Sequence, residues 1–252
     1  YSCALDPAGT PTCWGSDRYR TTRAPQESFD ELALGFDRAC GITSSGAVSC
    51  WGDGESDHIP KQGVKKIGLG SRAIACVLDD MGAIDCWVPD SSSATGFAQT
   101  RLEGTYTDLT AESGNICAID TSSRLRCWNT YNGSGWEETP LQSIEAVVGR
   151  YYQDVCGLTS AGTLACWGAM NGETTPSPDT LGPMVDMSIS DAYACGVDAQ
   201  GALSCWSTFK SSMVQYKPWD ATPSGTFRAI ESSQNRYCAI HTDDTLTCWQ
   251  SM

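Results

Sequence analysis

The stretch Cys40-Gly-Ile-Thr-Ser-Ser-Gly-Ala-Val-Ser-Cys50-Trp51 sets a pattern that recurs seven times along this 252-residue chain. Each copy has a cysteine, an aliphatic residue two positions later, a short polar turn, and a second cysteine followed by tryptophan. The two cysteines always lie ten positions apart, and the seven copies use all fourteen cysteines of the chain: Cys3 with Cys13, Cys40 with Cys50, Cys76 with Cys86, Cys117 with Cys127, Cys156 with Cys166, Cys195 with Cys205, and Cys238 with Cys248. The tryptophans that follow are Trp14, Trp51, Trp87, Trp128, Trp167, Trp206 and Trp249.

Each copy is predicted to form a β-hairpin. Alternate residues of a strand share a face, so folding a copy about its central turn brings its two cysteines opposite each other. The last residue of the three-residue loop needs a positive φ, which glycine adopts without steric cost. Opposed strand residues have Cα atoms roughly 4.5–5.5 Å apart, within the range of about 4.4–6.8 Å for disulfides. We therefore predict one cross-strand disulfide per hairpin. The residues at the last position of the seven hairpin loops are, in chain order, Gly9, Gly46, Gly82, Ser123, Gly162, Gly201 and Asp244.

A metal site is the competing interpretation of so many cysteines. Zinc sites use closely spaced pairs, usually with histidine, whereas nine residues separate every pair here and the only histidines are His58 and His241. We therefore expect disulfides rather than metal ligands or free thiols, and no cofactor. Seven disulfides are typical of an oxidising compartment, which predicts a secreted, periplasmic or cell-surface protein.

The repeats also predict the architecture. Successive first cysteines are separated by 37, 36, 41, 39, 39 and 43 residues, and a period near forty that contains a hairpin is typical of one propeller blade. Two apolar residues, three positions apart, precede six of the hairpins and predict a further strand in each: Phe29 and Leu32, Val64 and Ile67, Tyr106 and Leu109, Ile144 and Val147, Met184 and Met187, and Phe227 and Ile230. We expect an all-β fold: a seven-bladed β-propeller with one cross-strand disulfide hairpin per blade, formed as a single domain by residues 1–252.

The first blade is expected to be incomplete, because no such apolar pair precedes the hairpin of Cys3. The chain is therefore expected to be part of a longer polypeptide. A formal net charge of −14 argues against nucleic acid as a partner, since Lys and Arg supply most of the affinity for phosphates. We interpret the acidity as a contribution to solubility rather than as a sign of a specific cationic partner. The sequence has no run of about 18 apolar residues, so it predicts no membrane-spanning helix.

The pattern resembles the RCC1-like β-propeller repeat. The copy Cys156-Gly-Leu-Thr-Ser-Ala-Gly-Thr-Leu-Ala-Cys-Trp-Gly168, followed by Thr174-Thr175-Pro176, is a close match to it. The resemblance covers nearly the whole chain and implies a seven-bladed ring. The disulfide-bearing form is similar to extracellular members such as the crinkly repeats of plant receptor kinases, and a secreted bacterial β-lactamase inhibitor protein is a relative without the crosslinks. Trp87, Trp128, Trp206 and Trp249 depart from the repeat, because no glycine follows them.

A binding surface is expected on one face of the ring. The short hairpin turns emerge on one face and carry few large side chains, whereas the segments that follow each Cys-Trp emerge on the other. Aromatic residues among polar ones are typical of contact surfaces; the alternative is that they pack over the outer strands. The repeat tryptophans are predicted to be core residues. The candidate contact residues are Tyr131, Trp136, Tyr151, Tyr152, Phe209, Tyr216 and Trp219.

The sequence indicates no catalytic site. His58 follows an acidic loop and His241 occupies a hairpin-turn position, so nothing joins them to a serine and a carboxylate. In the loop of residues 53–57 every second residue is acidic, as in a weak calcium site, but the rest of an EF-hand pattern is absent from the sequence. Asn132 begins a glycosylation sequon, which has meaning only in a eukaryotic source.

We therefore expect an extracellular, non-catalytic protein-binding module on a rigid scaffold, whose partner is another protein or a surface assembly. Two alternatives remain open: a structural subunit or decorating domain of an extracellular assembly, and a secreted enzyme inhibitor. An enzyme that uses the central mouth of the propeller is the weakest possibility.

Overall fold

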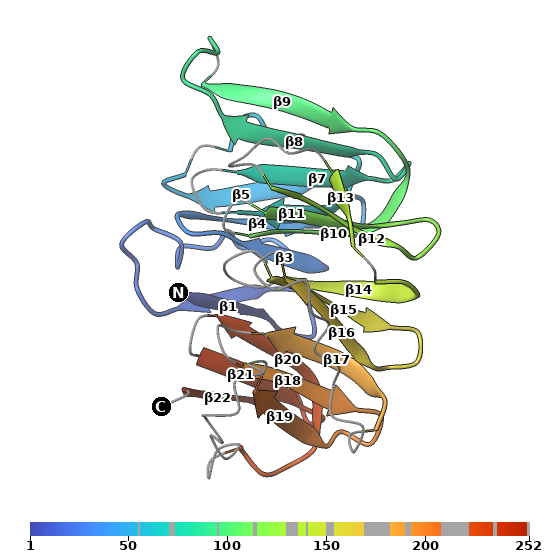
Figure 1. Cartoon of the computed structure of the whole chain (residues 1–252). Coiled ribbons are helices and arrows are strands. Elements are labelled where there is room, and N and C mark those ends of the chain that lie inside the picture. Colours follow the sequence, from blue (N-terminus) through green and yellow to red (C-terminus); the bar gives the residue numbers. More distant parts are fainter. Residues whose placement is uncertain are drawn as a thin grey trace. The chain divides into compact units, whose positions relative to one another are not determined.

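The computed structural model describes residues 1–54, 56–70, 74–94, 96–112, 115–129, 136–139, 141–149, 154–168, 182–189, 193–207, 222–233 and 236–250. Within them the fold is all-β, and antiparallel strands form seven small sheets (Figure 1). The sheets comprise β1 (Ser2–Leu5) and β2 (Pro11–Trp14); β3 (Glu31–Leu34), β4 (Arg38–Ile42) and β5 (Val48–Gly52); β6 (Val64–Leu69), β7 (Ala75–Asp79), β8 (Ile84–Pro89) and β9 (Phe97–Leu102); β10 (Tyr106–Glu112), β11 (Asn115–Asp120), β12 (Leu125–Asn129) and β13 (Trp136–Glu138); β14 (Ile144–Gly149), β15 (Asp154–Thr159) and β16 (Leu164–Gly168); β17 (Met184–Ile189), β18 (Tyr193–Asp198) and β19 (Leu203–Ser207); β20 (Phe227–Ser233), β21 (Arg236–His241) and β22 (Leu246–Gln250).

The predicted hairpins are confirmed. In the copy that runs from Cys40 to Trp51, Cys40 lies opposite Cys50 and Ile42 lies opposite Val48. The other hairpins have the same register wherever the structure describes their pairing; Cys76, for example, lies opposite Cys86.

Six of the predicted disulfides are present in the described part of the chain, and each closes its own hairpin. Their Cα atoms are 4.0–4.1 Å apart, somewhat closer than the roughly 4.5 Å expected for opposed strand residues. In the seventh pair the backbone of Cys156 lies opposite that of Cys166, whose side chain is outside the described part of the structure. The six bridges join Cys3 to Cys13, Cys40 to Cys50, Cys76 to Cys86, Cys117 to Cys127, Cys195 to Cys205, and Cys238 to Cys248.

The predicted turn geometry is also confirmed. All seven loop residues have a positive φ, and this includes Ser123 at 57° and Asp244 at 67°, where the sequence has no glycine. Their side chains do not prevent the turn, because a short polar residue enters the left-handed region at a cost of only about 1–2 kcal/mol.

The strands predicted ahead of the hairpins are β3, β6, β10, β14, β17 and β20, which we call the inner strands. Phe29 is the exception to the expected bounds, because it lies two residues before β3. A repeated hydrogen bond ties each inner strand to the hairpin before it. For example, the N–H of Val64 donates to the carbonyl of Gly46 at 3.2 Å, and the N–H of Tyr106 donates to that of Gly82 at 2.8 Å.

This hydrogen bond defines the two ends of every sheet. The hairpin turns and the starts of the inner strands lie at one end, which we call the turn end. Where the structure describes them, the segments after the Cys-Trp pairs and the loops before the first cysteines lie at the opposite end, which we call the loop end. The Asp53 N–H, just after β5, donates to the carbonyl of Asp37, just before β4, at 3.0 Å.

The chain divides into two compact units, residues 1–122 with 126–138 and residues 123–125 with 139–252. In each unit, buried aliphatic side chains from neighbouring sheets form the core. The first unit buries Ile42, Val48 and Val77 with Trp87, and the second buries Met187 with Trp206. The prediction that the repeat tryptophans pack in the core holds for Trp87 and Trp206, whereas Trp14, Trp51, Trp128 and Trp249 are only partly buried. The side chain of Trp167 lies outside the described part of the structure.

Two of the sheets have a fourth strand that the repeat pattern does not predict. β9 pairs with β8 and β13 pairs with β12, so part of the segment after Trp87 and of that after Trp128 extends the sheet. In the described part of the chain, no helix is long and apolar enough to cross a membrane.

Candidate binding surface

Most of the predicted contact residues lie outside the described part of the structure. This applies to Tyr131, Tyr151, Tyr152, Phe209, Tyr216 and Trp219, and also to the sequon residue Asn132. Trp136 opens β13 opposite Trp128, so its backbone belongs to a fourth strand rather than to a loop.

The structure places a different aromatic pair at the loop end of the first unit. Phe36, in the loop between β3 and β4, is 64% exposed, and in the described chain it is the one aromatic residue among the exposed large hydrophobic side chains. Its ring centroid lies 5.1 Å from that of Tyr19, from the segment after Trp14. The Arg18 guanidinium lies over the Tyr19 ring, 5.3 Å from its centroid. We call Arg18, Tyr19 and Phe36 the aromatic patch.

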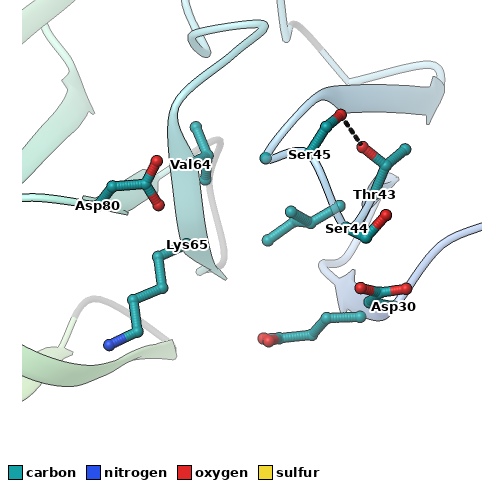
Figure 2. Close-up of a pocket in the computed structure, with 10 residues that line it drawn as sticks. Asp30, Thr43, Ser44, Ser45, Val64, Lys65 and Asp80 are labelled. Atoms are coloured by element: carbon teal, nitrogen blue, oxygen red, sulfur yellow. Dashed lines mark hydrogen bonds between the residues drawn. The ribbon is translucent and has the colours of Figure 1, made fainter.

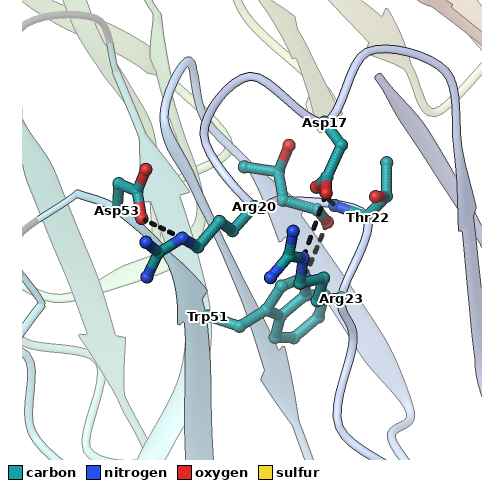
Figure 3. Close-up of polar contacts among 7 residues, drawn as sticks. Asp17, Arg20, Thr22, Arg23, Trp51 and Asp53 are labelled. Carbon is teal, nitrogen blue, oxygen red and sulfur yellow. Dashed lines mark hydrogen bonds and ion pairs between the residues drawn. The ribbon is translucent and has the colours of Figure 1, made fainter.

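Local turns shape the segment that carries Tyr19. The Arg20 N–H donates to the Asp17 carbonyl at 3.1 Å, and the Arg23 N–H donates to the Arg20 carbonyl at 3.2 Å. Arg20 has a φ of 56°, a conformation uncommon for a residue with a side chain. The Asp17 carboxylate accepts from the Thr22 N–H at 3.3 Å and the Arg23 Nε at 3.0 Å (Figure 3). Hydrogen bonds from Thr22, with a contribution from Arg23, lower the pKa of Asp17, so the carboxylate stays ionised.

The second sheet holds this segment in place. The Trp51 Nε1 donates to the carbonyl of the buried residue Thr21 at 2.8 Å, and the Asp53 N–H donates to the Tyr19 carbonyl at 2.9 Å. The Asp53 carboxylate also lies 3.4 Å from the Arg20 Nε (Figure 3). Side-chain and backbone groups of the second sheet thus fix the position of Tyr19, whereas the exposed ion pairs themselves contribute little energy.

The side chains of Tyr1 and Arg38 hold the loop that carries Phe36. The Tyr1 hydroxyl lies 2.7 Å from the carbonyl of Arg38 and 3.0 Å from that of Gly35, and burial raises the pKa of this phenol. Arg38 is only 1% exposed, and its side chain donates to the carbonyl of Ile74, just before β7, at 3.0 Å. Phe36 therefore projects from a loop whose backbone is fixed on both sides.

A polar pocket of about 320 Å³ lies at the turn end of the same unit, between the second and third sheets. Asp30 and Thr43–Ser45 lie on one side of it, and Lys65 and Asp80 lie on the other (Figure 2). Glu31 also lines the pocket, and burial raises the pKa of its carboxyl. In the described residues no group of histidine, cysteine and carboxylate side chains could hold a metal ion.

Both histidines pack against aromatic rings. The His58 ring lies 4.2 Å from that of Phe97, and burial lowers the pKa of His58 to about 4, so this imidazole is neutral at physiological pH. His241 is the last residue of β21 rather than part of the turn, 4.3 Å from the Phe227 ring. Its Nε2 lies 2.8 Å from the Thr247 hydroxyl. Both positions are explained by packing and hydrogen bonding within the sheets.

Solved structures resemble this one over most or nearly all of its length. The crinkly ectodomain of the Arabidopsis thaliana receptor kinase ACR4 matches with a TM-score of 0.72 and 19% identity, over 98% of this chain and 91% of that one. The ectodomain of the Physcomitrella patens receptor kinase CR4 matches with a TM-score of 0.73 and 20% identity, over 99% of this chain and 69% of that one. Yeast RCC1 (Prp20) matches with a TM-score of 0.65 and 10% identity, over 87% of this chain and 69% of that one.

The fold is that of the RCC1-like propellers. It is the disulfide-bearing form of this repeat fold, as the sequence predicted. No family model matches the sequence. A curated relative, the serine/threonine-protein kinase-like protein CCR4 of Arabidopsis thaliana, is 38% identical over 61 residues. These residues are 24% of this chain and 8% of that protein, so the match spans one or two RCC1-like repeats.

The RCC1-like repeat explains why the sequence did not reveal the aromatic patch. Tyr19 and Phe36 lie in two different connections, one after a Cys-Trp and one before a first cysteine, and neither is a repeat position. The sequence does contain one sign of Phe36's exposure. A large aromatic residue stands between Gly35 and Asp37, two residues after the end of β3, where a loop is expected to be polar.

Proposed function

We propose that this chain is an extracellular, non-catalytic protein-binding module that binds its partner through the aromatic patch at the loop end of the first unit. The main support for the proposal is the pair formed by the exposed Phe36 and the half-buried Tyr19. Part-buried hydrogen bonds from the Trp51 and Tyr1 side chains to backbone carbonyls hold the two segments that carry this pair. Aromatic side chains that are rigid before binding supply contact area at a low cost in conformational entropy.

We further propose that the seven sheets are the blades of one seven-bladed ring. The repeated hydrogen bond between each hairpin turn and the next inner strand supports this arrangement, because it links successive sheets in the same way along the chain. The likeness to RCC1-like propellers supports it at the level of the fold.

The extracellular location is supported by two observations. Six of the sheets each contain a disulfide within their hairpin, and such bridges form and persist in oxidising compartments. The similar structures from ACR4 and CR4 are ectodomains of receptor kinases.

Point variants in the patch and at the opposite end of the sheets test the proposed surface. The intact protein is panned against a random peptide display library, and the affinities of the selected peptides are measured for Tyr19→Ala, Phe36→Ala and the control Met81→Ala. Met81 is 86% exposed in a hairpin turn, so it reports on the turn end. We expect the patch variants to weaken binding about tenfold or more, as for interface anchors, while Met81→Ala binds normally.

The same set of variants can also contradict the proposal. Binding that survives Phe36→Ala and is lost in Met81→Ala would place the surface at the turn end. Melting temperatures within a few degrees of the parent protein show that the patch variants are folded, because both substituted side chains are largely surface contacts rather than core.

A further inference from the structure

Within the part of the chain that the structure describes, the aromatic patch contains a cation with no carboxylate partner. The segment after Trp14 carries three arginines in six residues, Arg18, Arg20 and Arg23. Arg20 pairs with Asp53 and Arg23 pairs with Asp17. In the described residues Arg18 forms no ion pair, and its contact is with the face of the Tyr19 ring.

The position of Arg18 leaves its guanidinium available to a ligand. The side chain is exposed, its contact is with the Tyr19 ring rather than with a carboxylate, and its N–H groups can therefore donate to an acceptor from outside. A carboxylate matches the edge of a guanidinium with two parallel hydrogen bonds. Arg18 is therefore placed to bind a carboxylate beside the exposed face of Phe36, whose ring lies against that of Tyr19.

The charge of the whole chain limits what the anion can be. At a net charge of −14, the protein repels a polyanion such as DNA or a highly sulfated glycan. A single carboxylate within hydrogen-bond reach of Arg18 is affected less, because salt screens more distant charges over about 8 Å at physiological ionic strength.

We propose that the aromatic patch recognises a partner segment in which an aspartate or glutamate stands next to an apolar side chain. The carboxylate binds the edge of Arg18, and the apolar side chain packs on Tyr19 and Phe36. This inference rests on the proposed function and specifies the partner chemistry of the same surface.

A double-mutant cycle on a selected peptide tests this inference. We expect the peptides selected by the intact protein to be enriched in an acidic residue adjacent to an apolar one. Arg18→Gln should weaken binding of such a peptide about tenfold, since charge-assisted hydrogen bonds are among the strongest polar contacts. Changing the peptide's Glu to Gln should weaken binding to the parent protein similarly and have no further effect in Arg18→Gln. Lys65→Gln, an exposed turn-end variant with the same charge change, should bind normally.

The outcomes separate this inference from the proposed function. If Phe36→Ala loses binding while Arg18→Gln keeps it, the carboxylate inference is wrong and the proposed surface stands. If neither variant affects binding, both are wrong. If Lys65→Gln weakens binding as much as Arg18→Gln, the effect comes from net charge and the specific role of Arg18 is contradicted.

Discussion

At the scale of single residues, the hairpin turns show how closely backbone geometry and residue type correspond. Five of the seven loop residues with positive φ are glycines, and Ser123 and Asp244 adopt the same conformation at a steric cost. The position could be predicted from the sequence because the cysteine spacing fixes the centre of the turn, and glycine follows that centre directly in five of the seven copies.

Replacing Ser123 by glycine should stabilise the protein. Glycine relieves the left-handed strain and keeps the hydrogen bond from the Ile144 N–H to the carbonyl at this position. We expect a gain of about 0.5–1 kcal/mol in the free energy of unfolding, measured by chemical denaturation. Gly201→Ser is the matched opposite change and should be destabilising, because a Cβ there would lie 2.9 Å from the Phe227 carbonyl oxygen. A loss of stability in Ser123→Gly would contradict this account of the turn.

His58 should make stability depend on pH. Burial is the main cause that lowers its pKa to about 4 from 6.5, with Arg38 and Lys61 contributing. Between these values the unfolded state binds the proton more strongly, so the contribution to stability is complete above about pH 6.5 and is lost as the pH falls towards 4. His58→Phe keeps an aromatic ring beside Phe97. We expect the melting temperature of this variant to fall less than that of the parent protein between pH 7 and pH 4.5; parallel curves would refute the assignment.

At the scale of the element, the inner strands carry a feature that the sequence signalled but did not identify. Val64 and Ile67 are both buried although they are three positions apart, whereas a regular strand places residues of one face two positions apart. A register shift between Val64 and Lys66 resolves this, and β10, β14, β17 and β20 have the same irregularity. The spacing of three is therefore explained by a β-bulge, whereas only the strand itself was predicted from it.

The disulfides of different hairpins should contribute unequally. Cys40 is fully buried in the core of the first unit, whereas Cys3 and Cys13 of the two-stranded sheet are partly exposed. Closing such a short loop adds about 2–3 kcal/mol in either case, and removing the buried sulfur leaves a cavity as well. We expect Cys40→Ala with Cys50→Ala to cost about 1 kcal/mol more in unfolding free energy than Cys3→Ala with Cys13→Ala. Equal costs in denaturant titrations would show that Cys40 packing contributes little.

At the scale of the whole molecule, the repeat made the fold predictable and the binding surface unpredictable. The seven copies share one cysteine spacing and one alternation of apolar and polar residues. Each copy therefore predicts the same hairpin, and together they predict a fold of repeated small sheets. Tyr19 and Phe36 belong to connections that differ from copy to copy. Their contact depends on the hydrogen bonds by which Trp51 and Asp53 hold the segment that carries Tyr19. A contact that depends on two different connections and a neighbouring sheet does not recur along the chain, so no repeat in the sequence indicates it.

The most direct test of the central claim is hydrogen–deuterium exchange on the intact protein with and without a selected peptide. The proposed surface predicts slower exchange at residues 17–23 and 35–38, the two segments that carry the aromatic patch, and unchanged exchange at the hairpin turns of residues 43–46 and 80–83. Protection confined to those turns, with none at residues 17–23 and 35–38, would contradict it and place recognition at the turn end.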